Sequence, residues 1–257
     1  MIKQTILDNG IRIITEQIPV AHSVSIGAWV ATGSRHEDAA LCGISHFAEH
    51  MFFKGTGHRS ARMIAREIDA VGGMLNAFTS HEFCCYYAKT LAHNLPLATD
   101  IISDILLNSL FALDEIEKER RVILNEIAMV EDTPDDQVHD LFGQLFWQGN
   151  ALARPILGSR ETVDNFDRDT LLNFVANRYC GENLLVTAAG NLEHQRVVDH
   201  VASEFLPFRR RVGFQSSLPR IIAAVSMFAA RISNRCTSAS EPGPCHRTTP
   251  TVFPFIT

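Results

Sequence analysis

The sequence predicts an α+β domain in which a largely antiparallel sheet packs against helices. Segments with the two-residue alternation of strands are interspersed with segments of helical periodicity, and hairpin turns are present. The 257 residues are 46% hydrophobic and 20% charged, which is typical of a globular protein that can bury a full core.

The N-terminal part begins with a hairpin. In MIKQTILDNGIRIITEQIP, two alternating runs flank a turn at Asp8-Asn9-Gly10. The segment Ser23–Val30 alternates as a half-buried strand does, and a helix with two histidines follows it. A second helix begins at Ser60, its predicted N-cap, and ends at Gly72-Gly73.

The middle of the chain predicts another hairpin and three helices. Residues 74–91 read as two strands around a polar turn, and apolar spacing marks an amphipathic helix over 95–106. A longer helix covers 114–130 and opens with the capping box Asp114-x-x-Glu117. Thr133-Pro134 begins a further helix, with proline at the first helical position.

The ordered part is expected to end near residue 208. A helix at 169–179, a strand at 183–190 and a helix at 194–205 precede this point, and the pattern then changes. Residues 209–257 begin with three arginines and become rich in Ser, Thr and Pro. We therefore predict a domain at 1–208 and a poorly ordered tail at 209–257, for which a truncated or frameshifted reading frame is one hypothesis.

The composition limits which binding partners and which cellular compartment are expected for this chain. The net charge of −6 indicates neither a nucleic-acid partner nor an anionic membrane partner, and no apolar run reaches the length of a membrane span. The N-terminus lacks the apolar core of a signal peptide. The six cysteines show no CxxC spacing and are expected to be reduced thiols. These observations predict a cytoplasmic location.

The motif His46-x-x-Glu49-His50 is the first candidate for chemistry. Histidines four residues apart lie on one face of a helix, so both imidazoles can reach one cation. Zinc accepts such nitrogens, and Glu49 is placed to act as the base that takes a proton from water. About 0.03 such motifs are expected by chance in this chain. The alternative is a pair of ordinary core histidines.

The helix at 114–130 carries two carboxylates, and one of them is the candidate for a third ligand. Glu119 and Glu126 fall along its apolar stripe, where a carboxylate is costly unless it is paired or bound to metal. Glu126 as a ligand, with Glu119 as its supporting contact, accounts for both. The alternative is that one of them borders the stripe and extends into water.

Three segments together resemble a known family. GISHFAEHMFFKGT, GGMLNAFT and the run around EKERRVILNEI are similar to the catalytic half of the pitrilysin-type (M16) zinc metallopeptidases, closest to mitochondrial processing peptidase and its bacterial relatives. The likeness covers about residues 2–208. It implies Zn²⁺ on His46, His50 and Glu126, with Glu49 as the catalytic base and Glu119 behind the ligands.

The resemblance also implies how substrate binds. Family members add a peptide substrate as a strand on an exposed sheet edge near the zinc. Asn76 and Ala77 match the N-A of the family motif and are expected to hold the peptide backbone or polarise the scissile carbonyl. The alternative for this segment is a tightly packed structural strand.

Family members typically have two similar halves that close around the peptide, whereas this chain matches one. The expected partner is therefore a peptide substrate, together with self-association or another chain that supplies a second half. The first functional hypothesis is a zinc-dependent endopeptidase that hydrolyses peptides or presequence-like segments. The alternative is a non-catalytic peptide-binding or assembly subunit that is inert because the second half is missing.

Overall fold

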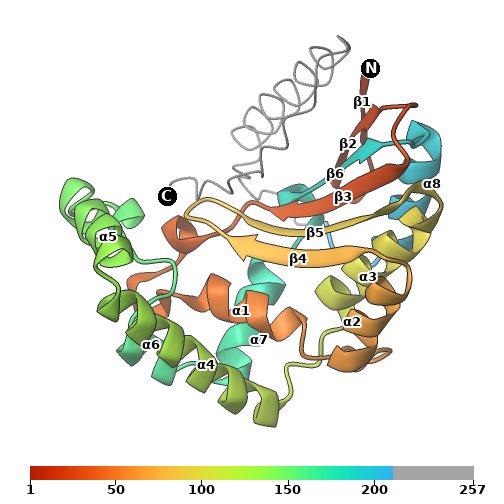
Figure 1. Ribbon diagram of the computed structural model, residues 1–257. Helices are drawn as coiled ribbons and strands as arrows, with labels where there is room; N and C mark the ends of the chain where they lie inside the picture. The colour runs from red at the N-terminus through yellow and green to blue at the C-terminus, as the bar shows by residue number, and fades with distance from the viewer. Residues whose placement is uncertain (211–257) are drawn as a thin grey trace, which may run out of the picture. The chain divides into compact units, whose positions relative to one another are not determined.

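The computed structural model describes residues 1–210. Within them lies a six-stranded sheet of order β1-β2-β6-β3-β5-β4 (Figure 1). The strands are β1 (Ile2–Ile6), β2 (Arg12–Gln17), β3 (Ser23–Val30), β4 (Met74–Thr79), β5 (Cys84–Leu91) and β6 (Leu184–Gly190). All neighbouring strands are antiparallel except β2 and β6, which run parallel. The predicted fold class is confirmed.

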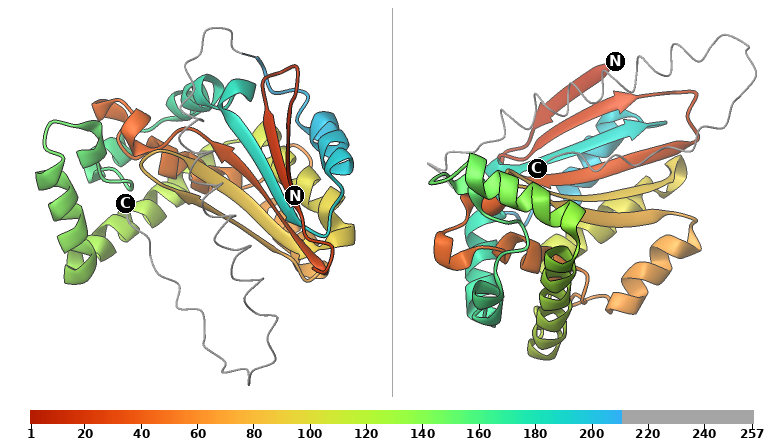
Figure 2. Two further views of the ribbon diagram at one scale, coloured as in Figure 1. Left: turned by 90° about the horizontal axis from the view of Figure 1, so that it is seen from above. Right: turned by 60° about the vertical axis from the view of Figure 1, so that its left-hand side comes forward.

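Some of the helices pack against this sheet, and others pack on those helices. They are α1 (Ile44–Phe52), α2 (Ala61–Ala70), α3 (Leu95–Asn108), α4 (Leu113–Asp132), α5 (Pro134–Phe146), α6 (Arg160–Asp164), α7 (Arg168–Arg178) and α8 (His194–Glu204). Figures 1 and 2 show α1, α2, α3 and α7 on the same side of the sheet. The hydrophobic core lies between these two layers and includes Phe47, Phe52, Tyr86, Ile101 and Val186, all fully buried.

The local signals account for most of these elements. Ser60 caps α2 by accepting a hydrogen bond from the backbone N–H of Met63, as predicted. The predicted capping box of α4 is wrong, because the helix begins one residue earlier, after Ala112. Asp114 then lies within the first turn, and its carboxylate pairs with Lys118 at 3.2 Å. The short helix α6 was not predicted, since five residues give too little periodicity.

The prediction about the tail falls on residues 209–257, which lie outside the described residues apart from Arg209 and Arg210. Cys42, Cys84 and Cys85 are buried free thiols. Within the same range, every helix falls short of the length and apolar character that crossing a membrane would need.

A buried carboxylate fixes the start of α1. Glu37 is 4% exposed, and its two oxygens accept hydrogen bonds from the backbone N–H groups of Gly43 (2.8 Å) and Ser45 (2.9 Å). Gly43 has φ +93°, and a Cβ there would lie 2.6 Å from the carbonyl oxygen of Leu157. Glycine is therefore required at this bend, and Glu37 replaces the N-cap side chain that glycine lacks. The direction of α1 is set by these contacts.

A cluster of ion pairs around Arg59 anchors the loop that follows α1. The guanidinium of Arg59 contacts carboxylates on α2 and α3, those of Glu67 (2.9 Å), Asp100 (2.5 Å) and Asp104 (2.9 Å). Asp104 is only 3% exposed and also accepts a hydrogen bond from Thr56 Oγ1 at 2.8 Å. Burial opposes ionisation of Asp104, but hydrogen bonds from Asn108, Thr56 and Arg59 outweigh it and lower its pKa.

Replacing Arg59 with alanine should lower the free energy of unfolding by about 3–5 kcal/mol, because it leaves the buried Asp104 carboxylate without its cation. Urea denaturation of the two chains measures this difference. Arg160→Ala is the matched control: its ion pair with Glu131 is 52% exposed on both sides, so its loss should leave the free energy of unfolding nearly unchanged. Equal effects of the two substitutions would contradict the structural role of Arg59.

Candidate metal centre

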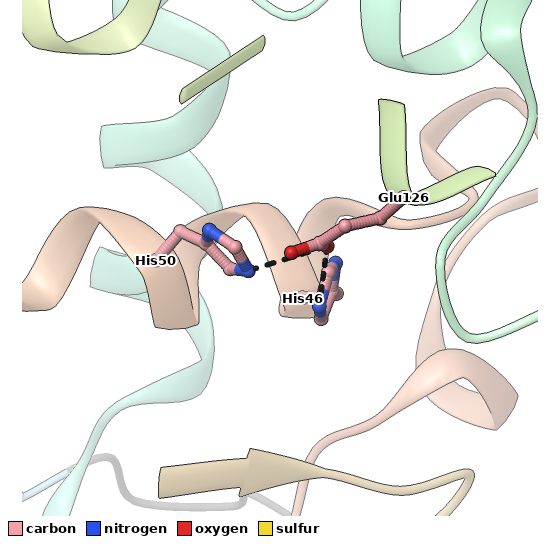
Figure 3. A group of neighbouring side chains, drawn as sticks. All are labelled: His46, His50 and Glu126. Atoms are coloured by element: carbon pink, nitrogen blue, oxygen red, sulfur yellow. Dashed lines mark ion pairs between the residues drawn. The ribbon is translucent and has the colours of Figure 1, made fainter. Parts of the chain in front are cut away.

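Helices α1 and α4 pack together and bring three potential ligands into one cluster. His46 and His50 lie one turn apart on the side of α1 that faces away from its buried residues, and Glu126 reaches them from α4 (Figure 3). One ligand atom from each residue lies within 4.8 Å of the other two. Glu126 Oε2 is 3.6 Å from His50 Nε2 and 3.8 Å from His46 Nε2.

The donor set and its spacing fit a zinc ion. Zinc holds nitrogen and oxygen ligands at about 2.0–2.2 Å in a tetrahedron, which places ligand atoms about 3.3–3.6 Å apart. The separations of 3.6 and 3.8 Å from Glu126 require only a small contraction, and the two histidine ligand atoms lie within 4.8 Å of each other. Two imidazoles and one carboxylate also leave the fourth tetrahedral position open, as hydrolytic zinc sites do.

Both imidazoles present Nε2 to Glu126. Burial, with a smaller contribution from the neighbouring His50, lowers the pKa of His46 to about 3, so its ring is neutral at pH 7. A neutral ring is the form that binds metal. Among the described residues, the close contacts of the Glu126 carboxylate with basic side chains are with these two histidines, so it points into the cluster rather than toward a surface cation.

Glu119 lies behind the cluster, but its contact differs from the predicted one. Its Oε2 is 3.0 Å from Nδ1 of His50, and its Oε1 is 2.7 Å from Nζ of Lys54. It therefore supports His50 rather than Glu126. A carboxylate on Nδ1 keeps the proton on that nitrogen and leaves Nε2 free for a metal. The sequence pattern did not identify Lys54, because only the fold brings it to Glu119.

Glu49 lies beside the cluster and is held by a residue that the sequence did not single out. Thr79 Oγ1, at the end of β4, donates a hydrogen bond of 2.5 Å to Glu49 Oε2. Burial raises the pKa of Glu49, while the hydrogen bond from Thr79 and the nearby His50 oppose that rise. A carboxyl group with a raised pKa is a better proton acceptor at neutral pH than an ordinary one.

Within the described residues, the strand β4 is at an edge of the sheet and pairs only with β5. It carries both residues predicted to hold substrate. Asn76 is exposed, and its Oδ1 accepts a hydrogen bond from the backbone N–H of Ala77 at 2.8 Å. This N–H is therefore already bonded, and a peptide that pairs with it must displace the Asn76 side chain.

A cavity of about 510 Å³ joins the cluster to the strand edge. His46 and Glu49 line one side, and Ala77, Phe78 and Thr79 of β4 line another. The remaining lining residues come from α4, α5 and the loop before α6, and are Val130, Asp136, His139, Asp140, Ile156 and Leu157. The cleft thus brings together one candidate ligand, the candidate base, the edge of β4 and an acidic wall formed by Asp136 and Asp140.

Comparisons with known proteins place these features in context. The family model described as Insulinase (Peptidase family M16) matches residues 12–160. A zinc protease of Bacillus subtilis, YmxG, is 45% identical over 199 residues, which are 77% of this chain and 49% of that protein. A zinc protease of Streptomyces coelicolor is 46% identical over 79% of this chain and 44% of its own length. The chain therefore spans about half the length of these curated relatives.

Solved structures share the fold. A protease from Helicobacter pylori superimposes with a TM-score of 0.77 at 21% identity, covering 84% of this chain and 52% of that one. The periplasmic protease PqqL from Escherichia coli gives a TM-score of 0.76 at 20% identity, covering 84% of this chain and 25% of its own. At these identities the likeness is one of fold alone.

Proposed function

The chain belongs to the insulinase family, peptidase family M16, and on that premise we propose that it is the zinc-binding half of a zinc-dependent endopeptidase. The observation that carries the proposal is the convergence of His46, His50 and Glu126 within 4.8 Å beside Glu49. A pair of ordinary core histidines would have no need of a carboxylate on Nε2 of both rings.

The roles of the individual residues follow from their contacts. A zinc ion held by His46, His50 and Glu126 would supply a Lewis acid and lower the pKa of water from about 16 to about 7. Glu49 accepts the proton from water and returns it to the leaving amine of the cleaved peptide. Thr79 holds the Glu49 carboxylate in one orientation, so the base faces the cleft before substrate arrives.

The walls of the cleft favour a particular class of peptide. We propose that substrate pairs with the free edge of β4 and that its side chains meet Asp136 and Asp140 of α5. Together with Glu49, these carboxylates make the cleft acidic, so segments with lysine or arginine near the scissile bond are preferred. Basic, presequence-like segments are of this kind.

The acidic wall can be tested with Asp140→Asn. We expect kcat/KM for a peptide with arginine near the cleavage site to fall by up to about fivefold, as loss of one partly exposed ion pair predicts. The same peptide with glutamine in place of arginine is the control and should be cleaved equally by both chains. A uniform loss on both peptides would show that Asp140 does not select charge.

The partner is a further proposal. Helix α5 exposes a row of large apolar side chains, and these are Val138, Leu141, Phe142, Leu145, Phe146 and Trp147. Contiguous exposed apolar groups mark interaction surfaces. Because the chain spans about half of its relatives, we propose that a second half, from another copy or a separate chain, covers this face. Sedimentation of the purified chain reports whether it associates with itself.

Cleavage of a mixed peptide library by the purified 257-residue chain with zinc tests the proposed activity. New cleavage products that depend on zinc support the endopeptidase. A folded, zinc-bound chain that cleaves nothing alone or with a partner half supports the alternative, a non-catalytic peptide-binding or assembly subunit.

A further inference from the structure

Behind the metal cluster, an ammonium group, a buried carboxylate and an imidazole form a continuous chain of contacts. Lys54 follows α1 in the sequence, and its Nζ lies 2.7 Å from Oε1 of Glu119 on α4. The other oxygen of Glu119 lies 3.0 Å from Nδ1 of His50. The three side chains therefore connect the end of α1 to α4 and back to a candidate ligand on α1.

The Glu119 carboxylate depends on Lys54 for its charge balance. Its side chain is 6% exposed, and a carboxylate removed from water is costly unless it is paired. Among residues 1–210, the ion pairs recorded for Glu119 are with His50 and Lys54. An imidazole that binds metal through Nε2 carries no net charge of its own, so the lysine is the partner with a permanent charge.

The two histidines are not supported equally. Nδ1 of His46 is buried and has no hydrogen-bond partner within the described part of the chain. Only His50 has a carboxylate that fixes which nitrogen carries the proton and how the ring is turned. The geometry of the ligand set therefore rests on the His50 side of the cluster.

We propose that Lys54 is a positioning residue for the metal site: its ammonium group holds Glu119 against Nδ1 of His50, so that Nε2 of His50 faces Glu126. The proposal rests on the proposed function in requiring that zinc binds at this cluster. It assigns to Lys54 a role that passes through Glu119, since the recorded contact of its ammonium group is with that carboxylate.

A simple charge effect predicts the opposite outcome, which makes the proposal testable. Removing a cation near a Zn²⁺ site strengthens metal binding if charge alone matters. Removing a cation that orients a ligand weakens metal binding, because Glu119 loses its counterion and turns away from His50. Loss of such supporting contacts typically costs about 10- to 100-fold in metal affinity.

The experiment measures the zinc dissociation constant of the full 257-residue chain by competition with a chromophoric chelator. The variants are Lys54→Met, Lys54→Arg, Glu119→Gln and the double variant Lys54→Met/Glu119→Gln. Lys118→Met is the matched control. Lys118 is next to Glu119 in the sequence, but its ion pairs, with Asp114 and Glu115, are on the surface. Circular dichroism of the metal-free chains checks folding, and Lys54→Gln replaces Lys54→Met if the latter does not fold.

We expect Lys54→Met to weaken zinc binding by about tenfold, and Lys54→Arg and Lys118→Met to change it by less than about threefold. In the Glu119→Gln background, Lys54→Met should have less than about a twofold effect, because the two residues act as one unit. Unchanged or tighter zinc binding by Lys54→Met overturns the proposal, as does a tenfold loss that persists without Glu119. If Glu126→Gln leaves zinc affinity unchanged, the proposed metal site itself fails, which is a separate result.

Discussion

Glu49→Gln is expected to lower kcat/KM for peptide cleavage by about 10²–10⁴-fold while zinc remains bound, because glutamine keeps the shape of the side chain but cannot accept a proton. Thr79 can still donate its hydrogen bond to the glutamine oxygen, so the local structure should persist. Initial cleavage rates on a basic peptide, with zinc content measured on the same samples, provide the test.

Glu193→Gln is the control for this substitution. Glu193 carries an exposed carboxylate at the start of α8, paired with Arg196, and its loss should leave turnover unchanged. If Glu49→Gln and the native chain cleave at the same rate, Glu49 is not the base. If neither chain cleaves any peptide, the comparison is repeated with a second M16-type half added to both.

Glu126→Gln is expected to weaken zinc binding by more than about 100-fold, which exceeds the usual cost of losing a residue that only supports a ligand. The amide cannot provide the anionic oxygen that completes the set with His46 and His50. Equilibrium dialysis against buffered zinc measures the change.

Glu117→Gln is the matched control for Glu126→Gln. It lies on the same helix, is 62% exposed, and pairs with Arg120 away from the cluster. Its zinc affinity should equal that of the native chain. Equal zinc affinity for Glu126→Gln and Glu117→Gln would exclude Glu126 as a ligand.

Much of the fold could be predicted because its signals are local. The alternation in Ser23–Val30 and the Ser60 N-cap both correspond to elements of the structure. The capping box at Asp114 failed because α4 begins at Leu113, after Ala112, which places Asp114 inside the first turn instead of at the N-cap. The spacing of Asp114 and Glu117 is the same in either case, so residue types alone do not fix where the helix starts.

The candidate site could likewise be predicted in part from local signals. The pair His46 and His50 follows from the period of one helix, and the misplaced charges Glu119 and Glu126 follow from the period of another. The contacts that Lys54 and Thr79 make with Glu119 and Glu49 join segments far apart in the chain. No local pattern encodes them, so they became visible only once the fold had brought those segments together.

An anomalous difference map at the zinc absorption edge, from crystals of the 257-residue chain grown with zinc, is the most direct test of the metal centre. The account predicts one strong peak about 2.0–2.2 Å from Nε2 of His46, Nε2 of His50 and a carboxylate oxygen of Glu126. Crystals that contain zinc but show no peak at this cluster would contradict it.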